Sequence, residues 1–164
     1  MHFLLLHFNS LFGPEVFLSL PDDIPGNLSN KIQKIFDLEV LDNFFEITIK
    51  KENIKITNMY LELSSQWARG GVEMIMLSVL TGEEVDNTLF HDILNEYAHK
   101  LKNTPNISKS FYESDKVHSD DNEIKIKKEE LREILLECYN HLKTTTKPDY
   151  DGKPIIKKFK QLHW

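Results

Sequence analysis

The chain has 164 residues, of which 40% are hydrophobic, and its formal net charge is −6. A chain of this length can bury roughly 70% of its unfolded surface in one domain. The negative charge argues against nucleic acid as a partner, because it offers no basic field for phosphates. The single cysteine, Cys138, excludes an internal disulfide and a cysteine-based zinc cluster, so we expect a buried thiol in a reducing compartment.

The apolar N-terminus, residues 2–8, is interpreted as a strand and not as a secretion signal. It lacks a Lys/Arg-rich start, contains two histidines and leads to Gly13-Pro14 instead of a small-residue cleavage site. No apolar run of the sequence approaches the ~18 residues that a membrane-spanning helix requires. We therefore expect a cytoplasmic protein with at most peripheral contact to membranes through its partners.

The first part of the chain predicts an antiparallel sheet with one early helix. Two β-rich runs joined by a turn-like segment predict an opening hairpin, and apolar residues at helical spacing predict a helix after it. Two alternating runs and one run that is apolar on both faces then predict three more strands. The expected strands are 2–8, 15–20, 44–50, 54–63 and 74–80, and the expected helix is about 27–38. The alternation is blurred near Asn58, which predicts a bulge there.

The second part of the chain predicts two more helices. Asp86 to Thr88 has the residue types that cap a helix, and the apolar residues after it keep helical spacing. Residues 103–123 combine a proline with several Asn, Ser and Asp residues, which predicts a mobile connection. The expected helices cover about 88–102 and 125–143. We expect a single domain over 1–143, followed by a C-terminal tail over 144–164.

Motifs for catalysis and for metal binding are absent from the sequence or incomplete. No glycine-rich nucleotide cradle and no nucleophile elbow occurs. His91, Asn95 and His99 stack at i, i+4 and i+8 along the second helix, but no third ligand completes a metal site. The acidic run 115–123 lacks the glycine and the alternating oxygen ligands of a calcium loop. We expect no metal, no cofactor and no catalytic centre within the chain itself.

The most informative segment is the loop from Ser64 to Gly71, between two predicted strands. It carries Trp67 and places Arg69 directly before Gly70 and Gly71, which let the backbone project the side chain. Arginine suits the spread negative charge of a phosphoryl group in transfer, because its planar fork stays charged and donates several hydrogen bonds. The loop is therefore a candidate site for contact with a phosphate-bearing partner.

The residue types also leave a simpler interpretation of this loop open. Arg69 would then be a solvated loop residue, or it would pair with Glu62 or Glu73. Trp67 would pack against the edge of the sheet and would not face a partner.

The order of predicted elements resembles that of the longin domain: strand, strand, helix, three strands, helix, helix. This resemblance implies an α/β (α+β) fold, a longin-like and profilin-like α-β-α sandwich. Its five-stranded antiparallel sheet would carry one helix on one face and two on the other. The resemblance covers about residues 1–102, and the third helix matches in position only.

Two local motifs look like those of one longin group, the nitrogen permease regulator-like and folliculin (DENN-associated) proteins. The opening hairpin resembles theirs in placing Gly13-Pro14 between its strands and in following the second strand with Pro21 and an acid. The segment Trp67-Ala68-Arg69-Gly70, which precedes the apolar strand 72–80, is similar to their aromatic-small-Arg-small segment.

The resemblance implies a partner and a role for the loop. Members of this group act on small GTPases of the Rag and Arf type, and the arginine of this segment is the family's arginine finger. By position, Arg69 would be that residue, supplied in trans to activate GTP hydrolysis. The chain would then be a small-GTPase-binding module of a trafficking or nutrient-signalling type. The expected partner-binding residues are Trp67, Gly70 and Gly71 in the loop and Lys31 and Lys34 in the first helix.

Two further functions stay open. A non-catalytic adaptor would pair with a longin or roadblock-like protein, or with a second copy, through a sheet edge or its first helix. Arg69 would be dispensable in an adaptor. A PAS-like small-molecule sensor would instead have a cavity inside the core between sheet and helices.

Overall fold

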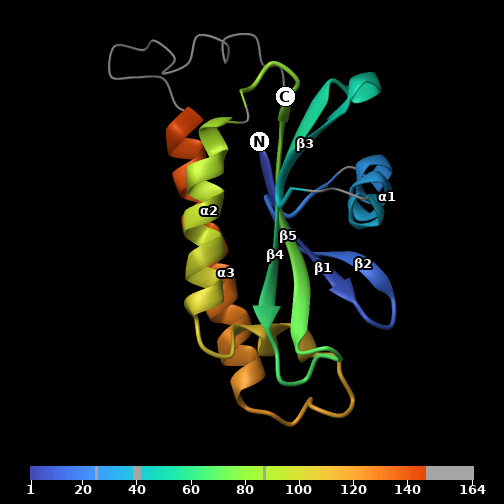
Figure 1. Cartoon of the computed structure of the whole chain (residues 1–164), viewed down its shortest axis with the longest axis vertical. Helices are drawn as coiled ribbons and strands as arrows, with labels where there is room; N and C mark the ends of the chain where they lie inside the picture. The colour runs from blue at the N-terminus through green and yellow to red at the C-terminus, as the bar shows by residue number, and fades with distance from the viewer. Residues whose placement is uncertain (25, 39–41, 87, 147–164) are drawn as a thin grey trace.

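The structure, a computed structural model, describes residues 1–24, 26–38, 42–86 and 88–146. It is an α+β fold built on one open sheet of five antiparallel strands in the order β2-β1-β5-β4-β3 (Figure 1). The strands are β1 His2–Asn9, β2 Gly13–Leu20, β3 Phe44–Ile49, β4 Ile54–Ser64 and β5 Val72–Gly82. All five strands expected from the sequence are therefore confirmed.

The helices are also close to their predicted positions. The α-helices are α1 Gly26–Gln33, α2 Thr88–Asn103 and α3 Glu123–Thr146, and the 3-10 helices are η1 Lys34–Asp37, η2 Lys50–Glu52 and η3 Ile107–Tyr112. The first predicted helix is thus α1 continued by η1. The predicted cap of α2 is confirmed, since the Asp86 Oδ1 accepts a hydrogen bond from the Thr88 backbone N–H at 3.1 Å. The part of the expected tail after residue 146 lies outside the described residues.

Strand alternation divides the core between the two faces of the sheet. In β1, Phe3 and Leu5 belong to a cluster with buried residues of α2 and α3, whereas Leu4 and Leu6 belong to a cluster with Leu28 and other residues of α1 and η1. Figure 1 shows α2 and α3 side by side against the sheet and α1 on its other side. Because side chains of a strand point alternately to opposite faces, a central strand buried on both faces reads as a continuous apolar run.

The cysteine lies in the larger of these clusters. Cys138 of α3 is fully buried and free, as the helical pattern predicted. Burial raises the pKa of its thiol, with the carboxylates of Glu96 and Glu137 adding to the effect. The thiol therefore stays protonated at neutral pH and contributes to packing.

The bulge expected near Asn58 is wrong. Asn58 pairs in regular register with Phe45 of β3 and Ser78 of β5, and the irregular register lies instead between Leu5 and Leu6 of β1. The alternation is blurred at Asn58 because this polar side chain is buried, where its Oδ1 accepts a 2.7 Å hydrogen bond from the Ser78 hydroxyl.

The connection between α2 and α3 is folded against the rest of the chain. Residues 103–123, which the sequence predicted to be mobile, include η3 and bury the side chains of Ile107, Ser108 and Ser110. Its mobility itself stays a prediction. Within the residues that the structure describes, no helix combines the length and the apolar character that a bilayer crossing demands.

Candidate functional site

The loop that joins β4 to β5 is closed by its own hydrogen bonds. The Ser65 backbone N–H donates to the Gly71 carbonyl at 2.9 Å, and the Gly71 N–H donates to the Ala68 carbonyl at 3.0 Å. The Ser65 hydroxyl oxygen accepts a further bond from the Ala68 N–H at 3.1 Å. These bonds fix a tight turn whose outermost residue, Arg69, is exposed.

Two glycines after Arg69 make this turn feasible. Gly70 and Gly71 have φ angles of 95° and 81°, in the left-handed region that side-chain-bearing residues rarely adopt. No neighbouring atom lies within 4 Å of the position that a Cβ would take at either glycine. The two glycines are therefore required by backbone conformation and not by a close contact.

Trp67 anchors the loop from within. Its half-buried ring stacks on the His118 imidazole with centroids 4.2 Å apart and meets the Tyr112 ring edge-on at 5.1 Å. The Lys109 Nζ lies 5.0 Å from the centroid of the indole ring, in cation–π geometry. Trp67 thus packs against the connection between α2 and α3, not against the sheet edge as the simpler interpretation suggested.

Glu73, the second residue of β5, is the buried hub beneath the loop. Its carboxylate accepts hydrogen bonds from the His7 Nε2 at 2.8 Å, from the Ser65 hydroxyl at 3.2 Å and from the Tyr112 hydroxyl. Burial alone would raise the pKa of Glu73, but these hydrogen bonds and the charge of His7 hold it below its ordinary value of 4.5. The ionised carboxylate is therefore the form that the fold stabilises.

The hub ties together five segments of the chain, namely β1, β2, loop 65–71, β5 and η3. His7 comes from β1, and its Nδ1 lies 3.4 Å from the Glu15 carboxylate of β2. Its ring also stacks on Phe111 of η3 with centroids 4.1 Å apart and an interplanar angle of 8°. Burial and the neighbouring Glu73 carboxylate raise the pKa of Tyr112, which keeps its hydroxyl protonated as a donor.

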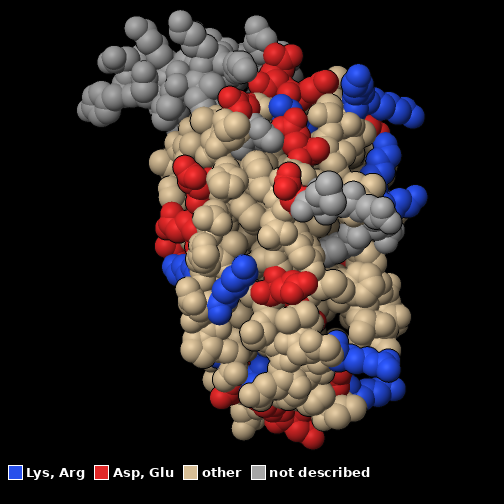
Figure 2. Space-filling view, viewed as in Figure 1, with Lys and Arg blue, Asp and Glu red and all other residues tan. Residues whose placement is uncertain are grey.

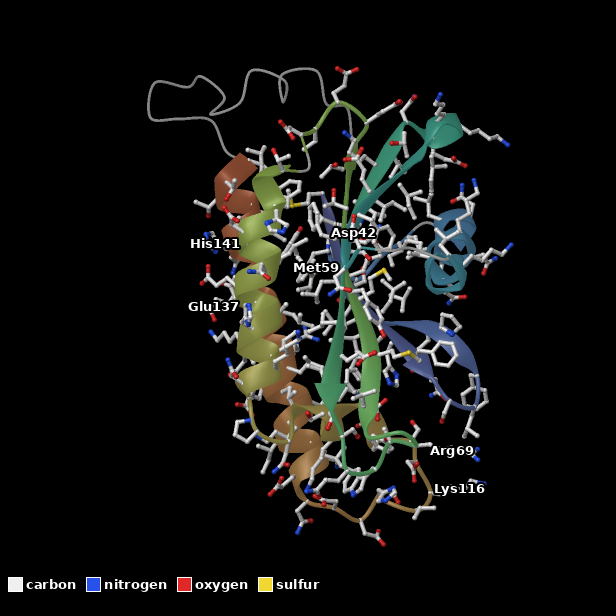
Figure 3. All side chains as sticks on the ribbon, viewed as in Figure 1. Asp42, Met59, Arg69, Lys116, Glu137 and His141 are labelled. Carbon is white, nitrogen blue, oxygen red and sulfur yellow. The ribbon has the colours of Figure 1, made fainter. Side chains whose placement is uncertain are left out.

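Arg69 is the cation that these contacts leave unused. Glu73 is engaged by its buried donors, and the Glu62 carboxylate accepts a hydrogen bond from the Tyr60 hydroxyl at 2.9 Å. Neither acid pairs with Arg69, and the guanidinium forms no ion pair with any residue that the structure describes. Figure 3 shows the side chain pointing away from the body of the protein.

The two lysines predicted as partner-binding residues lie elsewhere. The Lys31 Nζ pairs with the Glu52 carboxylate, next to the start of β4, and Lys34 is exposed on η1. Loop 65–71 follows the end of β4, and a strand of this length spans roughly 30 Å. The structure therefore brings Trp67, Gly70 and Gly71 together with Arg69, but not Lys31 or Lys34.

The histidines of α2 do not gather ligands for a metal. His91 contacts the ring of Phe44 edge-on and lies 3.3 Å from the Asp92 carboxylate. Together with Asn95 and His99 it lines an open pocket beside β3 and β4. Among the described residues, no three His, Cys, Asp or Glu side chains are grouped as a metal site would need.

Sequence reasoning missed the hub that supports the loop. A signal was present, because His7 and Glu73 are ionisable residues inside strands that are mostly apolar. Such residues are usually buried only when paired. Which residues would pair could not be read from the chain, since His7 and Glu73 are 66 positions apart.

Comparison with known proteins adds no assignment. No protein-family model matches the chain, and no curated protein sequence is significantly similar to it.

Proposed function

We propose that this chain is a longin-like binding module for a small GTPase of the Rag, Arf or Rab type, in trafficking or nutrient signalling. In this proposal loop 65–71 presents Arg69 to the bound nucleotide and stimulates GTP hydrolysis in trans. The chain order of strands and helices and the five-stranded antiparallel sheet support the longin-like arrangement, with α1 on one face and α2 and α3 on the other.

The observation that carries the proposal is the state of Arg69. It is exposed at the tip of a turn fixed by hydrogen bonds, and no described residue neutralises it. An arginine that acts on a partner needs both reach and a free charge. The guanidinium can face the charge that develops on the equatorial oxygens of the transferred phosphoryl group, where an arginine finger acts chiefly in the transition state.

Single-turnover GTP hydrolysis by a panel of Rag-, Arf- and Rab-type GTPases tests this proposal. We expect the wild-type chain to stimulate one panel member and Arg69→Ala to lose that stimulation by a factor on the order of 10³. Arg69→Lys should lose most of it as well, because an ammonium group lacks the planar fork. Binding of the GTPase should change little in both variants.

Arg132→Ala is the matched control, since Arg132 is the other arginine of the chain and is exposed on α3. This variant should stimulate like the wild type. Binding to a GTPase without any stimulation would sink the finger proposal.

Such a result would favour a non-catalytic adaptor that pairs with a longin or roadblock-like partner. The open sheet gives this alternative its own support, because β2 and β3 are edge strands to which a partner strand can be added.

A further inference from the structure

The three most exposed large apolar side chains among the described residues lie in two turns near loop 65–71. Leu11, Phe12 and Val117 have exposed fractions of 83%, 82% and 83%. Leu11 and Phe12 form the turn between β1 and β2, and Val117 lies in the segment between η3 and α3. Apolar residues gathered on a surface mark interaction sites more often than single ones do.

Two contacts place these turns beside the arginine loop. The first is the 2.8 Å hydrogen bond between His7 and Glu73, which sets the β1–β2 turn next to the start of β5. The second is the stacking of His118, the residue after Val117, on Trp67. Figure 3 shows Arg69 and Lys116 projecting from neighbouring loops at this end of the molecule.

Each turn is held in shape before any partner arrives. The Asn9 Oδ1 accepts hydrogen bonds from the backbone N–H groups of Leu11 at 2.8 Å and Phe12 at 3.2 Å. The Asp115 Oδ1 accepts one from the Val117 N–H at 2.7 Å. Because the backbone of each turn is already fixed by these bonds, docking the turn against a partner costs less conformational entropy than ordering a loose loop.

The charged side chains around loop 65–71 and the two turns indicate which surface a partner would present. Lys109 is neutralised by Asp121 and Glu123 at 3.0 and 3.2 Å, whereas Arg69 and Lys116 have no ion-pair partner within the described part of the chain. Two free cations beside an apolar tip complement a surface that combines negative charge with an apolar depression.

A folded partner fits this surface better than an anionic membrane does. Figure 2 shows acidic side chains along the lower edge of the molecule, next to the basic ones that project at the lower right. The chain as a whole carries a net charge of −6. An extended anionic lipid surface would repel these acids, whereas a protein can place its carboxylates only opposite the cations.

We infer that the β1–β2 turn, Arg69 and the Lys116–Val117 turn form the docking surface for the small GTPase, an inference that rests on the proposed function. Leu11 and Phe12 enter an apolar depression of the GTPase and supply affinity. Arg69 and Lys116 face the phosphates of the nucleotide and the carboxylates around them. Binding and stimulation then depend on different residues of one surface.

Titration with the panel GTPases, loaded with a non-hydrolysable GTP analogue, measures the affinity that the inference assigns to Leu11 and Phe12. For the double variant Leu11→Ser/Phe12→Ser we expect the Kd to rise on the order of tenfold or more. The rate of GTP hydrolysis at saturating concentrations should stay within about twofold of wild type, because Arg69 is intact. Leu136→Ser on α3, also exposed, is the control and should leave the Kd unchanged.

The charge part is tested by Lys116→Glu in the same titration. We expect slower association and a weaker dependence of the association rate on salt, because attraction between the free lysine and the negative partner surface is lost. Lys51→Glu makes the same charge change on the exposed surface of η2, near the start of β4, and should have little effect.

The outcomes separate the two proposals. If the wild-type chain binds no panel member, the docking inference and the proposed function both fall. If the stimulation of GTP hydrolysis depends on Arg69 while Leu11→Ser/Phe12→Ser, the variant of the β1–β2 turn, binds the GTPase with wild-type affinity, only the docking inference falls. Binding to vesicles of phosphatidylcholine and phosphatidylserine that is lost in the turn variant, without GTPase binding, would overturn it in favour of a lipid surface.

Discussion

Two cations near opposite ends of strand β4, Lys31 and Arg69, differ in whether the fold pairs them with an acid. At its start, Lys31 is paired with Glu52. At its end, Arg69 stays free although Glu73 follows four residues later, because the Glu73 carboxylate is buried and taken by His7, Ser65 and Tyr112. Closeness in sequence therefore does not neutralise a charge. A buried hub can hold an acid away from a neighbouring arginine and leave the arginine available to a partner.

The largest effect is expected from removing the Glu73 carboxylate, which holds the hub together. Glu73→Ala leaves three buried or half-buried donors without their acceptor, and we expect it to lower the free energy of unfolding by about 3 kcal/mol. Glu52→Ala, the matched change at the other end of β4, should cost much less. Urea denaturation measures both, and equal losses would contradict the role of the hub.

The same hub predicts an acid-sensitive fold. The pKa of Glu73 is lower in the folded chain than its ordinary value of 4.5, so the ionised carboxylate stabilises the fold above that pH. This stabilisation is lost as the pH falls through the folded-state pKa. The free energy of unfolding of Glu73→Gln should therefore fall less steeply below pH 4.5 than that of the wild type. Equal slopes for the two proteins in this pH range would assign the loss to other groups.

A smaller effect is expected from the backbone of the arginine loop. Gly71→Ala forces a Cβ into a φ of 81° and should cost about 1 kcal/mol of unfolding free energy. Gly26→Ala, at the first residue of α1, adds a methyl group where the space is likewise open and the φ is ordinary. We expect this control to be neutral in thermal unfolding. A destabilised Gly26→Ala would show that the cost is not specific to the left-handed turn.

The smallest effect is expected from the paired cation. The Lys31 side chain is 43% exposed and that of Glu52 is 17% exposed, so solvent and salt screen their attraction. A double-mutant cycle with Lys31→Ala and Glu52→Ala should give a coupling of about 0.5 kcal/mol or less. A much larger coupling would mean that the Lys31–Glu52 pair contributes to the stability of the fold to a degree similar to that of the Glu73 hub.

The amino-acid sequence by itself determined the elements of this fold. The opening hairpin, the double-sided apolar run of β5 and the helical spacing of α2 and α3 are local patterns, and local patterns fix strand and helix because side chains repeat with periods of two and 3.6. The sequence also marked Arg69 and its two glycines, since left-handed turns select glycine for a local steric reason. The blurred alternation at Asn58 led to the wrong prediction of a bulge, because its cause, a hydrogen bond to Ser78 of another strand, is not a local pattern.

Only the tertiary structure decided which side chains the fold engages and which it leaves free. His7, Glu73 and Tyr112 meet because β1 pairs with β5 and η3 packs beside them, and Trp67 meets His118 across 51 positions of chain. Contacts of this kind depend on strand register and on the packing of distant segments, which have no periodic signature in the sequence. The free charge of Arg69 is a consequence of those contacts, and so is the docking surface inferred around it.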